Sequence, residues 1–117
     1  MLKPIELFNE RTGLSLGNEI YLASTFRTRL IGLLGRSSLK PGQGMLIERC
    51  NQVHMLFMRF EIGIVFLSPE WKIVGLEPCL KTWTISSRVE DASSVLELPL
   101  GVIESTGCQL GDLLVAR

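Results

Sequence analysis

Short runs of apolar and β-branched residues, separated by closely spaced turn signals, dominate the pattern along this chain. The turn signals are glycines, prolines and Gly-Asp or Gly-Asn pairs, and they recur from Thr12-Gly13 to Gly111-Asp112. Short apolar runs bounded in this way are typical of β-strands. The expected strands are Glu19–Ala23, Met45–Glu48, Val53–Met58, Ile62–Leu67, Lys72–Leu76, Thr82–Ile85, Val95–Leu98 and Leu113–Ala116.

The run Ile62–Leu67 is apolar at almost every position, which predicts a strand that is covered on both faces. It is followed by Ser68-Pro69-Glu70-Trp71, a sequence that favours a tight turn. We therefore expect a hairpin in which Ile62–Leu67 pairs with the next strand, which begins near Lys72.

Helical signals are confined to two places. Thr25 is a suitable N-cap for a helix up to Leu34, because Phe26 and Leu30 fall on one face with Leu34 and because Gly35 can end it. A second short helix is expected after Pro99, through residues 101–105, ending at Gly107. The pattern thus predicts a mainly β fold, a compact single domain over residues 1–117, built as a β-sandwich or barrel with one or two short helices.

Composition supports one globular domain, and the distribution of charged residues bears on where in the cell the protein resides. The chain has 117 residues, 46% of them hydrophobic, with a mean hydropathy of +0.30. The longest stretch without a charged residue is Cys50–Met58, which is far shorter than the ~20 residues that a membrane helix needs. Charged residues at Glu6, Glu10 and Arg11 interrupt the place where a signal peptide has its apolar core. We expect no transmembrane segment and a cytoplasmic protein.

The net charge is zero, from 12 basic and 12 acidic residues, which argues against a general nucleic-acid-binding protein. The charges are unevenly distributed, however. Residues 27–59 hold six basic residues and one acidic residue, whereas residues 60–117 hold four basic and eight acidic residues. Either these blocks intermingle on a solvated surface, or the basic block forms a recess for an anionic ligand.

The candidate chemistry of the cysteines and glycine-rich turns is limited. Cys50, Cys79 and Cys108 are an odd number, are widely spaced and form no CxxC pair, so we expect neither a zinc site nor a disulfide framework. There is no phosphate-binding loop motif and no GxSxG nucleophile motif. We therefore assign no catalytic residue, metal or cofactor. Gly111-Asp112 favours a tight turn before the last strand, and Trp71 and Trp83 are expected at the edge of the core.

Three blocks of residues, taken together, resemble a known family. The blocks are ASTFRTR with GLLGR at 23–36, GML, Cys50, VH, FMRF and VFL between 44 and 67, and VLELP, Gly101, Gly107 and GD between 95 and 112. Their order and spacing are similar to the domain of unknown function one-nine-two family of small bacterial and archaeal proteins, over about residues 20–116. The resemblance implies a compact β-sandwich or barrel of jelly-roll type with one short helix, and it implies no reaction.

The resemblance has one departure. After Met58-Arg59-Phe60, the family pattern usually continues with proline, a branched apolar residue and aspartate, whereas this chain has Glu61, Ile62 and Gly63. If that aspartate binds or reacts in relatives, this chain lacks it at position 63. Glu61 stands two positions earlier on the same strand face and is the only nearby candidate to replace it.

His54 is the only histidine, and it lies on the extended, otherwise apolar run 53–58. It is either a packed imidazole satisfied by a backbone partner or the polar group of a small-ligand pocket. Glu97, which alternates with apolar residues on its strand, could approach it from a paired strand. The candidate ligand-binding residues are His54, Met58, Arg29, Arg36, Arg59 and Glu97.

The leading prediction is a non-enzymatic binding or accessory protein that holds an anionic small molecule or a segment of a protein partner. One alternative is a hydrolase- or isomerase-like enzyme that uses His54 with Glu97 or Glu61. For the two arginines the alternative to ligand binding is a structural role, in which Arg29 makes an ion pair and Arg36 caps the carbonyls at a helix end. A third function, a structural accessory of an envelope, secretion or pilus assembly, comes from the resemblance, because some relatives are associated with such components. The sequence does not define the oligomeric state.

Overall fold

The computed structural model of the chain describes residues 3–23, 39–55 and 59–117. Within them, seven strands form a single sheet in the order β5-β4-β6-β3-β2-β1-β7. The strands are β1 (Ile5–Asn9), β2 (Ser15–Ala23), β3 (Gln43–Glu48), β4 (Ile62–Leu67), β5 (Ile73–Leu80), β6 (Ser94–Pro99) and β7 (Leu114–Ala116), and the short helix α2 is Val102–Ser105. The expected mainly β, single-domain fold with a short helix is therefore confirmed.

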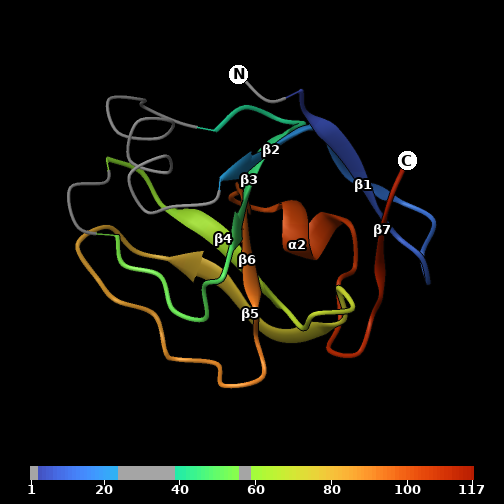
Figure 1. Cartoon of the computed structure of the whole chain (residues 1–117). Helices are drawn as coiled ribbons and strands as arrows, with labels where there is room; N and C mark the ends of the chain where they lie inside the picture. Colours follow the sequence, from blue (N-terminus) through green and yellow to red (C-terminus); the bar gives the residue numbers. More distant parts are fainter. Residues whose placement is uncertain (1–2, 24–38, 56–58) are drawn as a thin grey trace.

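The sheet curls so that its two outer strands approach each other (Figure 1). Lys72 at the start of β5 forms a bridge with Leu113 next to β7. The amide of Ile73 donates to the carbonyl of Asp112 at 2.8 Å, and the amide of Leu114 donates to the carbonyl of Trp71 at 2.9 Å. Most neighbouring strands are antiparallel, but β2 and β3 are parallel. A parallel pair needs a crossover connection, and the helix expected from Thr25 to Leu34 falls in it, outside the described residues.

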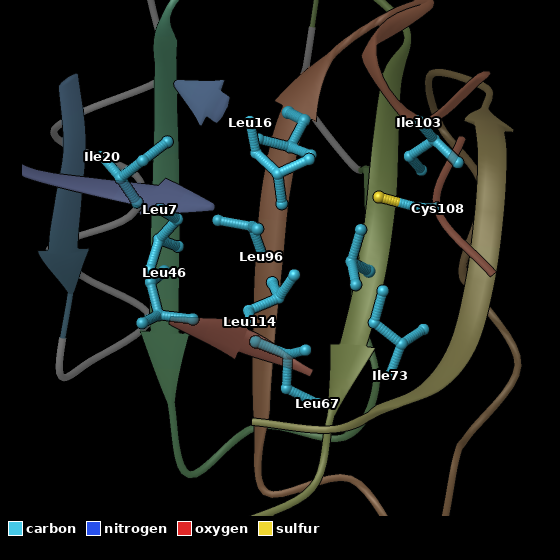
Figure 2. Close-up of a cluster of buried hydrophobic side chains, with 12 residues drawn as sticks. Leu7, Leu16, Ile20, Leu46, Leu67, Ile73, Leu96, Ile103, Cys108 and Leu114 are labelled. Atoms are coloured by element: carbon cyan, nitrogen blue, oxygen red, sulfur yellow. The ribbon is translucent and has the colours of Figure 1, made fainter. Parts of the chain in front are cut away.

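Two apolar cores occupy the two faces of the sheet. The inner core lies within the curl, where side chains from β1, β2, β3, β6 and β7 meet Ile103 of α2 (Figure 2). The outer core lies on the opposite face and contains Met45, Ile64 and Val95 together with Val53 and Met55 from the segment after β3. Strand β4 contributes to both cores and all six of its residues are buried, as its apolar sequence predicts.

The turns and the second helix confirm the sequence predictions. The amide of Trp71 donates to the carbonyl of Ser68 at 2.9 Å, which closes the β4–β5 hairpin. Helix α2 follows Pro99 and ends where the amide of Gly107 donates to the carbonyl of Glu104 at 3.2 Å. Gly107 has a φ of 68°, a left-handed conformation that glycine adopts without strain.

Three of the expected strands need correction, and one strand was not expected. Strand β1 was not expected, β2 begins at Ser15 instead of Glu19, and residues 53–55 and 82–85 are not regular strands but share one isolated bridge. Strand β1 buries Leu7 and Asn9 on one face, so its alternation includes a polar residue that the apolar pattern does not count. The segments 53–55 and 82–85 pair with each other instead of joining the sheet.

Candidate functional site

Glu97 lies in the middle of the sheet and is completely buried, with 0% of its surface exposed. On β6 it is paired with Met45 of β3 on one side and with Ile64 of β4 on the other. Its neighbours Leu96 and Leu98 belong to the inner core, so strand alternation places Glu97 on the outer-core face. A glutamate side chain is thus held among the apolar residues of the outer core.

A two-stranded ribbon covers the outer core; we define it as residues 51–55 and 81–89. Backbone hydrogen bonds join the two segments. At one end the amide of Val89 donates to the carbonyl of Asn51 at 2.9 Å, and at the other end the amide of Trp83 donates to the carbonyl of Met55 at 2.8 Å. In Figure 1 these segments, a green trace after β3 and an orange trace before β6, run side by side at the lower left. The ribbon is the layer that closes over the face of the sheet where Glu97 lies.

His54 belongs to the ribbon and forms a bridge with Ile85. The amide of Ser86 donates to the carbonyl of Val53, and the amide of Met55 donates to the carbonyl of Thr84, both at 2.7 Å. These bonds flank His54 and Ile85, which makes them a non-hydrogen-bonded pair with closely spaced side chains. Val53 and Met55 are buried in the outer core, so alternation directs His54 toward the outside, where Ile85 is 60% exposed. The His54 segment thus packs on the face of the sheet to which Glu97 belongs, but alternation turns the imidazole away from the outer core, and its Nδ1 atom is buried there.

The remaining candidate residues are only partly described. Arg59 is exposed and precedes β4. Arg29, Arg36 and Met58 lie outside the described residues, so their predicted roles as ligand-binding residues remain predictions.

Glu61, the candidate replacement for the aspartate of the family pattern, is on the surface. The thiol of Cys79 on β5 donates to its carboxylate at 2.5 Å. Gly63, by contrast, is buried, and a Cβ atom at this position would stand 3.0 Å from Ile103 Cδ1 in the inner core. The side chain of Glu61 therefore does not lie in the inner core, where a side chain at position 63 would lie.

We expect Glu61→Gln to make Cys79 more reactive. The hydrogen bond to the Glu61 carboxylate raises the pKa of the Cys79 thiol, so little thiolate is present near neutral pH. Removing the negative charge lowers this pKa, so the rate of alkylation by iodoacetamide at mildly alkaline pH rises several-fold. Peptide mapping of the modified residue measures it. Glu104→Gln is the control, because Glu104 makes only the smallest contribution to the same pKa, and an equal rate increase in both variants would contradict the prediction.

Asp112 is the centre of a buried polar cluster at the other end of the molecule. Its carboxylate accepts hydrogen bonds from Arg11 Nε at 2.7 Å, from Asn9 Nδ2 at 2.8 Å and from the amide of Gln109 at 2.9 Å. These bonds, above all the one from Arg11, hold the pKa of Asp112 well below its usual range. The amide of Asp112 also donates to the carbonyl of Gln109 at 3.1 Å, so Gly111-Asp112 forms the predicted turn.

Three further observations bear on chemistry. Cys50, Cys79 and Cys108 form no disulfide. In the part of the chain that the structure describes, no three His, Cys, Asp or Glu side chains are grouped closely enough to hold a metal ion. Within the same residues, no helix has the length and apolar character needed to cross a membrane.

Comparisons with known proteins place the chain in a family. The model of the DUF192 family, described as "Uncharacterized ACR", matches residues 8–116. The chain belongs to the DUF192 family. This is the domain of unknown function one-nine-two family that the motifs predict, and the match extends upstream to include β1 from Phe8 onward.

DUF192 relatives include archaeal proteins of similar size. A UPF0127 protein from Pyrococcus furiosus is 32% identical over 114 residues, covering 92% of this chain and 95% of that protein. One from Thermococcus gammatolerans is 28% identical, covering 92% of this chain and 72% of that protein.

Two crystal structures share the DUF192 fold seen here. A protein from Sinorhizobium meliloti, described as a proposed transcription regulator, has a TM-score of 0.81 at 21% identity, covering 99% of this chain and 97% of that one. A protein of unknown function from Novosphingobium aromaticivorans has a TM-score of 0.79 at 18% identity, covering 96% of this chain and 83% of that one. At these identities the likeness establishes the fold alone.

The DUF192 motifs did not point to every notable residue. Trp83, expected at the edge of the core, is 61% exposed, whereas Trp71 does pack against the inner core. The burial of Asn9 beside Asp112 was also missed. An asparagine and an arginine just before the expected turn at Thr12-Gly13 give no sign of a partner about a hundred residues away; only the Gly-Asp turn was visible in the sequence.

Proposed function

We propose that this DUF192 protein is a non-enzymatic binding protein whose site lies on the outer-core face of the sheet around Glu97, beneath the ribbon. The ligand is an anionic small molecule or a segment of a partner protein. One observation carries the proposal: Glu97 is fully buried between Met45 and Ile64 on an apolar face. Burying a carboxylate costs free energy that a leucine at the same position would not cost, so a role besides stability is supported.

In the proposed site, arginine residues bind the anion. A buried carboxylate orients hydrogen-bond donors, and an arginine held in this way can present its guanidinium group to an anion. Arg59, which is exposed, and Arg29 and Arg36 come from the basic block at 27–59 and are the residues proposed for this role. Met58 completes the proposed site, whereas strand alternation turns His54, the other predicted residue, to the opposite face of the ribbon.

The described geometry favours binding over catalysis by His54. A general base needs a carboxylate that orients it within hydrogen-bond reach. Val53 and Met55 are the residues that point to the Glu97 face, and His54, between them, is paired with the exposed Ile85. Glu61 is engaged with Cys79 at the surface. The enzyme alternative would regain support only if a substrate screen found an activity that His54→Ala abolishes in a folded variant.

We expect carboxylates or phosphates to shift the NMR resonances of residues around Glu97. The experiment titrates ¹⁵N-labelled protein with inorganic phosphate, citrate and, as an uncharged control, glucose. Glu97→Gln keeps the shape of the side chain but removes the charge proposed to hold an arginine in place. The affinity for the anion is therefore expected to fall by about tenfold or more.

The matched control is Glu77→Gln, because Glu77 is paired with Ile64 on the other side of the same strand and is only half-buried. Thermal unfolding checks that both variants remain folded. If no ligand shifts resonances near Glu97 or His54, or if Glu97→Gln binds as tightly as the wild type, the proposed site is wrong.

A further inference from the structure

The outward face of the ribbon carries two large, exposed apolar side chains. Trp83 is 61% exposed and Ile85 is 60% exposed, and Ile85 is the cross-strand partner of His54. A hydrogen bond of 2.8 Å from the amide of Trp83 to the carbonyl of Met55 fixes the position of Trp83 next to this pair. Exposed tryptophans of this kind are the side chains that most often dominate the binding energy of protein interfaces.

The backbone at Trp83 shows that the fold alone does not favour tryptophan there. Its φ is 62°, in the left-handed region, where a residue with a bulky side chain is less stable than in the ordinary conformation. Glycine or asparagine would occupy this turn more readily. Trp83 is nonetheless 61% exposed, and backbone conformations of this kind are found preferentially at functional positions.

The charge of the ribbon indicates the chemistry of the partner. Its charged side chains are Lys81 and Arg88, both exposed, and it contains no aspartate or glutamate. Arg49 precedes it, and the acidic pair Glu90 and Asp91 follows it in the turn before β6. The basic side chains of the ribbon thus both come from residues 81–89, within the otherwise acidic C-terminal half of the chain, and residues 51–55 contain no acidic residue.

From these observations we infer that the outward face of the ribbon, formed by Trp83, Ile85 and Lys81, docks an acidic segment of a partner protein that carries an apolar or aromatic anchor. The anchor packs against Trp83 and Ile85, while the acidic side chains meet Lys81 and Arg88. This surface lies on the opposite side of the ribbon from Glu97, so the inference does not depend on the proposed site there.

The test selects binders from a displayed library of random peptides on the immobilised protein. We expect the selected peptides to be rich in Asp and Glu around an apolar or aromatic residue. A fluorescein-labelled copy of a selected peptide then gives the affinity by anisotropy. Trp83→Asn, which suits the left-handed backbone and should fold well, is expected to weaken binding by about tenfold or more. Lys81→Glu is expected to weaken it as well, and added salt should reduce wild-type binding.

Leu110→Asn is the matched control, because Leu110 is 66% exposed but lies outside the ribbon, before β7. This variant and Glu97→Gln are both expected to bind the peptide as the wild type does. Selected peptides without an acidic excess, peptides that Trp83→Asn still binds, or no selected peptide at all would overturn the inference. Light scattering that shows a dimer of the wild type but not of Trp83→Asn would overturn it too, because the face would then serve a second copy of the chain.

Discussion

Asp112→Ala is expected to lower the free energy of unfolding by about 3 kcal/mol. The carboxylate is buried and accepts hydrogen bonds from Arg11, Asn9 and the amide of Gln109. Of these donors, Asn9 is itself completely buried, so its side-chain amide loses a partner that water cannot replace. Arg11 is 48% exposed and regains solvent, so it contributes less to the loss.

The effect is large because this cluster joins parts of the chain that are distant in sequence. Asn9 ends β1 and Asp112 precedes β7, the strand that pairs with β1. The carbonyl of Asp112 also accepts a hydrogen bond from the amide of Ile73 in β5, where the sheet curls back on itself. Urea unfolding followed by circular dichroism measures the loss. Asp91→Ala, at an exposed position, is the control and is expected to change stability by less than about 0.5 kcal/mol.

The same carboxylate makes a specific contribution to acid sensitivity. The pKa of Asp112 is lower in the folded protein than its unfolded value of about 3.9, so its charge stabilises the fold at pH values above the unfolded pKa. This contribution is lost as the pH falls from there toward the folded pKa. The stability difference between wild type and Asp112→Ala should therefore shrink below about pH 4. A difference that stays constant down to acidic pH would show that the charge of Asp112 is not responsible.

Gly63→Asp is expected to destabilise the protein by about 3 kcal/mol or more at neutral pH. Gly63 lies on β4 between Ile62 and Ile64, and strand alternation directs its side-chain position into the inner core. A Cβ atom there would be 3.0 Å from Ile103 Cδ1 and 3.4 Å from the carbonyl oxygen of Pro78. An aspartate would bring its charge into this apolar contact. The usual residue of the family pattern is therefore unfavourable in this chain, where α2 presents an isoleucine to the position.

Gly63→Ala separates the effect of volume from that of charge. The atom in closest contact is the end of a flexible side chain, so alanine is expected to cost only about 1 kcal/mol. The buried aspartate would have a raised pKa, and acidification should therefore recover part of the stability of Gly63→Asp relative to wild type. Equal destabilisation by alanine and aspartate, measured by thermal and urea unfolding, would mean that crowding rather than charge decides.

The elements predicted correctly are those whose signals are local. The run 62–67 is apolar throughout and became a strand buried on both faces, because such a run can satisfy its side chains only inside the protein. The turn at Ser68–Trp71 and the helix after Pro99 followed from residues that restrict or permit particular backbone angles. The motifs also predicted the family, and the match of the family model to residues 8–116 confirms it.

The errors occurred where the outcome depends on a distant partner. The segments 53–58 and 82–85 have strand-like composition, but residues 53–55 and 82–85 pair with each other above the sheet instead of joining it. Nothing within either segment decides between these outcomes, because its backbone can form hydrogen bonds either with a strand of the sheet or with the other segment. Trp83, an aromatic residue that composition assigns to the edge of the core, is 61% exposed and lies in a turn with a φ of 62°.

The sequence by itself determined the fold class, the family, the central strand, the main turns and the uneven distribution of charge. The tertiary structure decided which polar groups are buried and what they contact: Asn9 with Asp112, and Glu97 between Met45 and Ile64. Periodicity and turn chemistry act over a few residues, so they can be read along the chain. The burial of a charge depends on groups that only folding brings together, and the candidate sites of this protein are built from such groups.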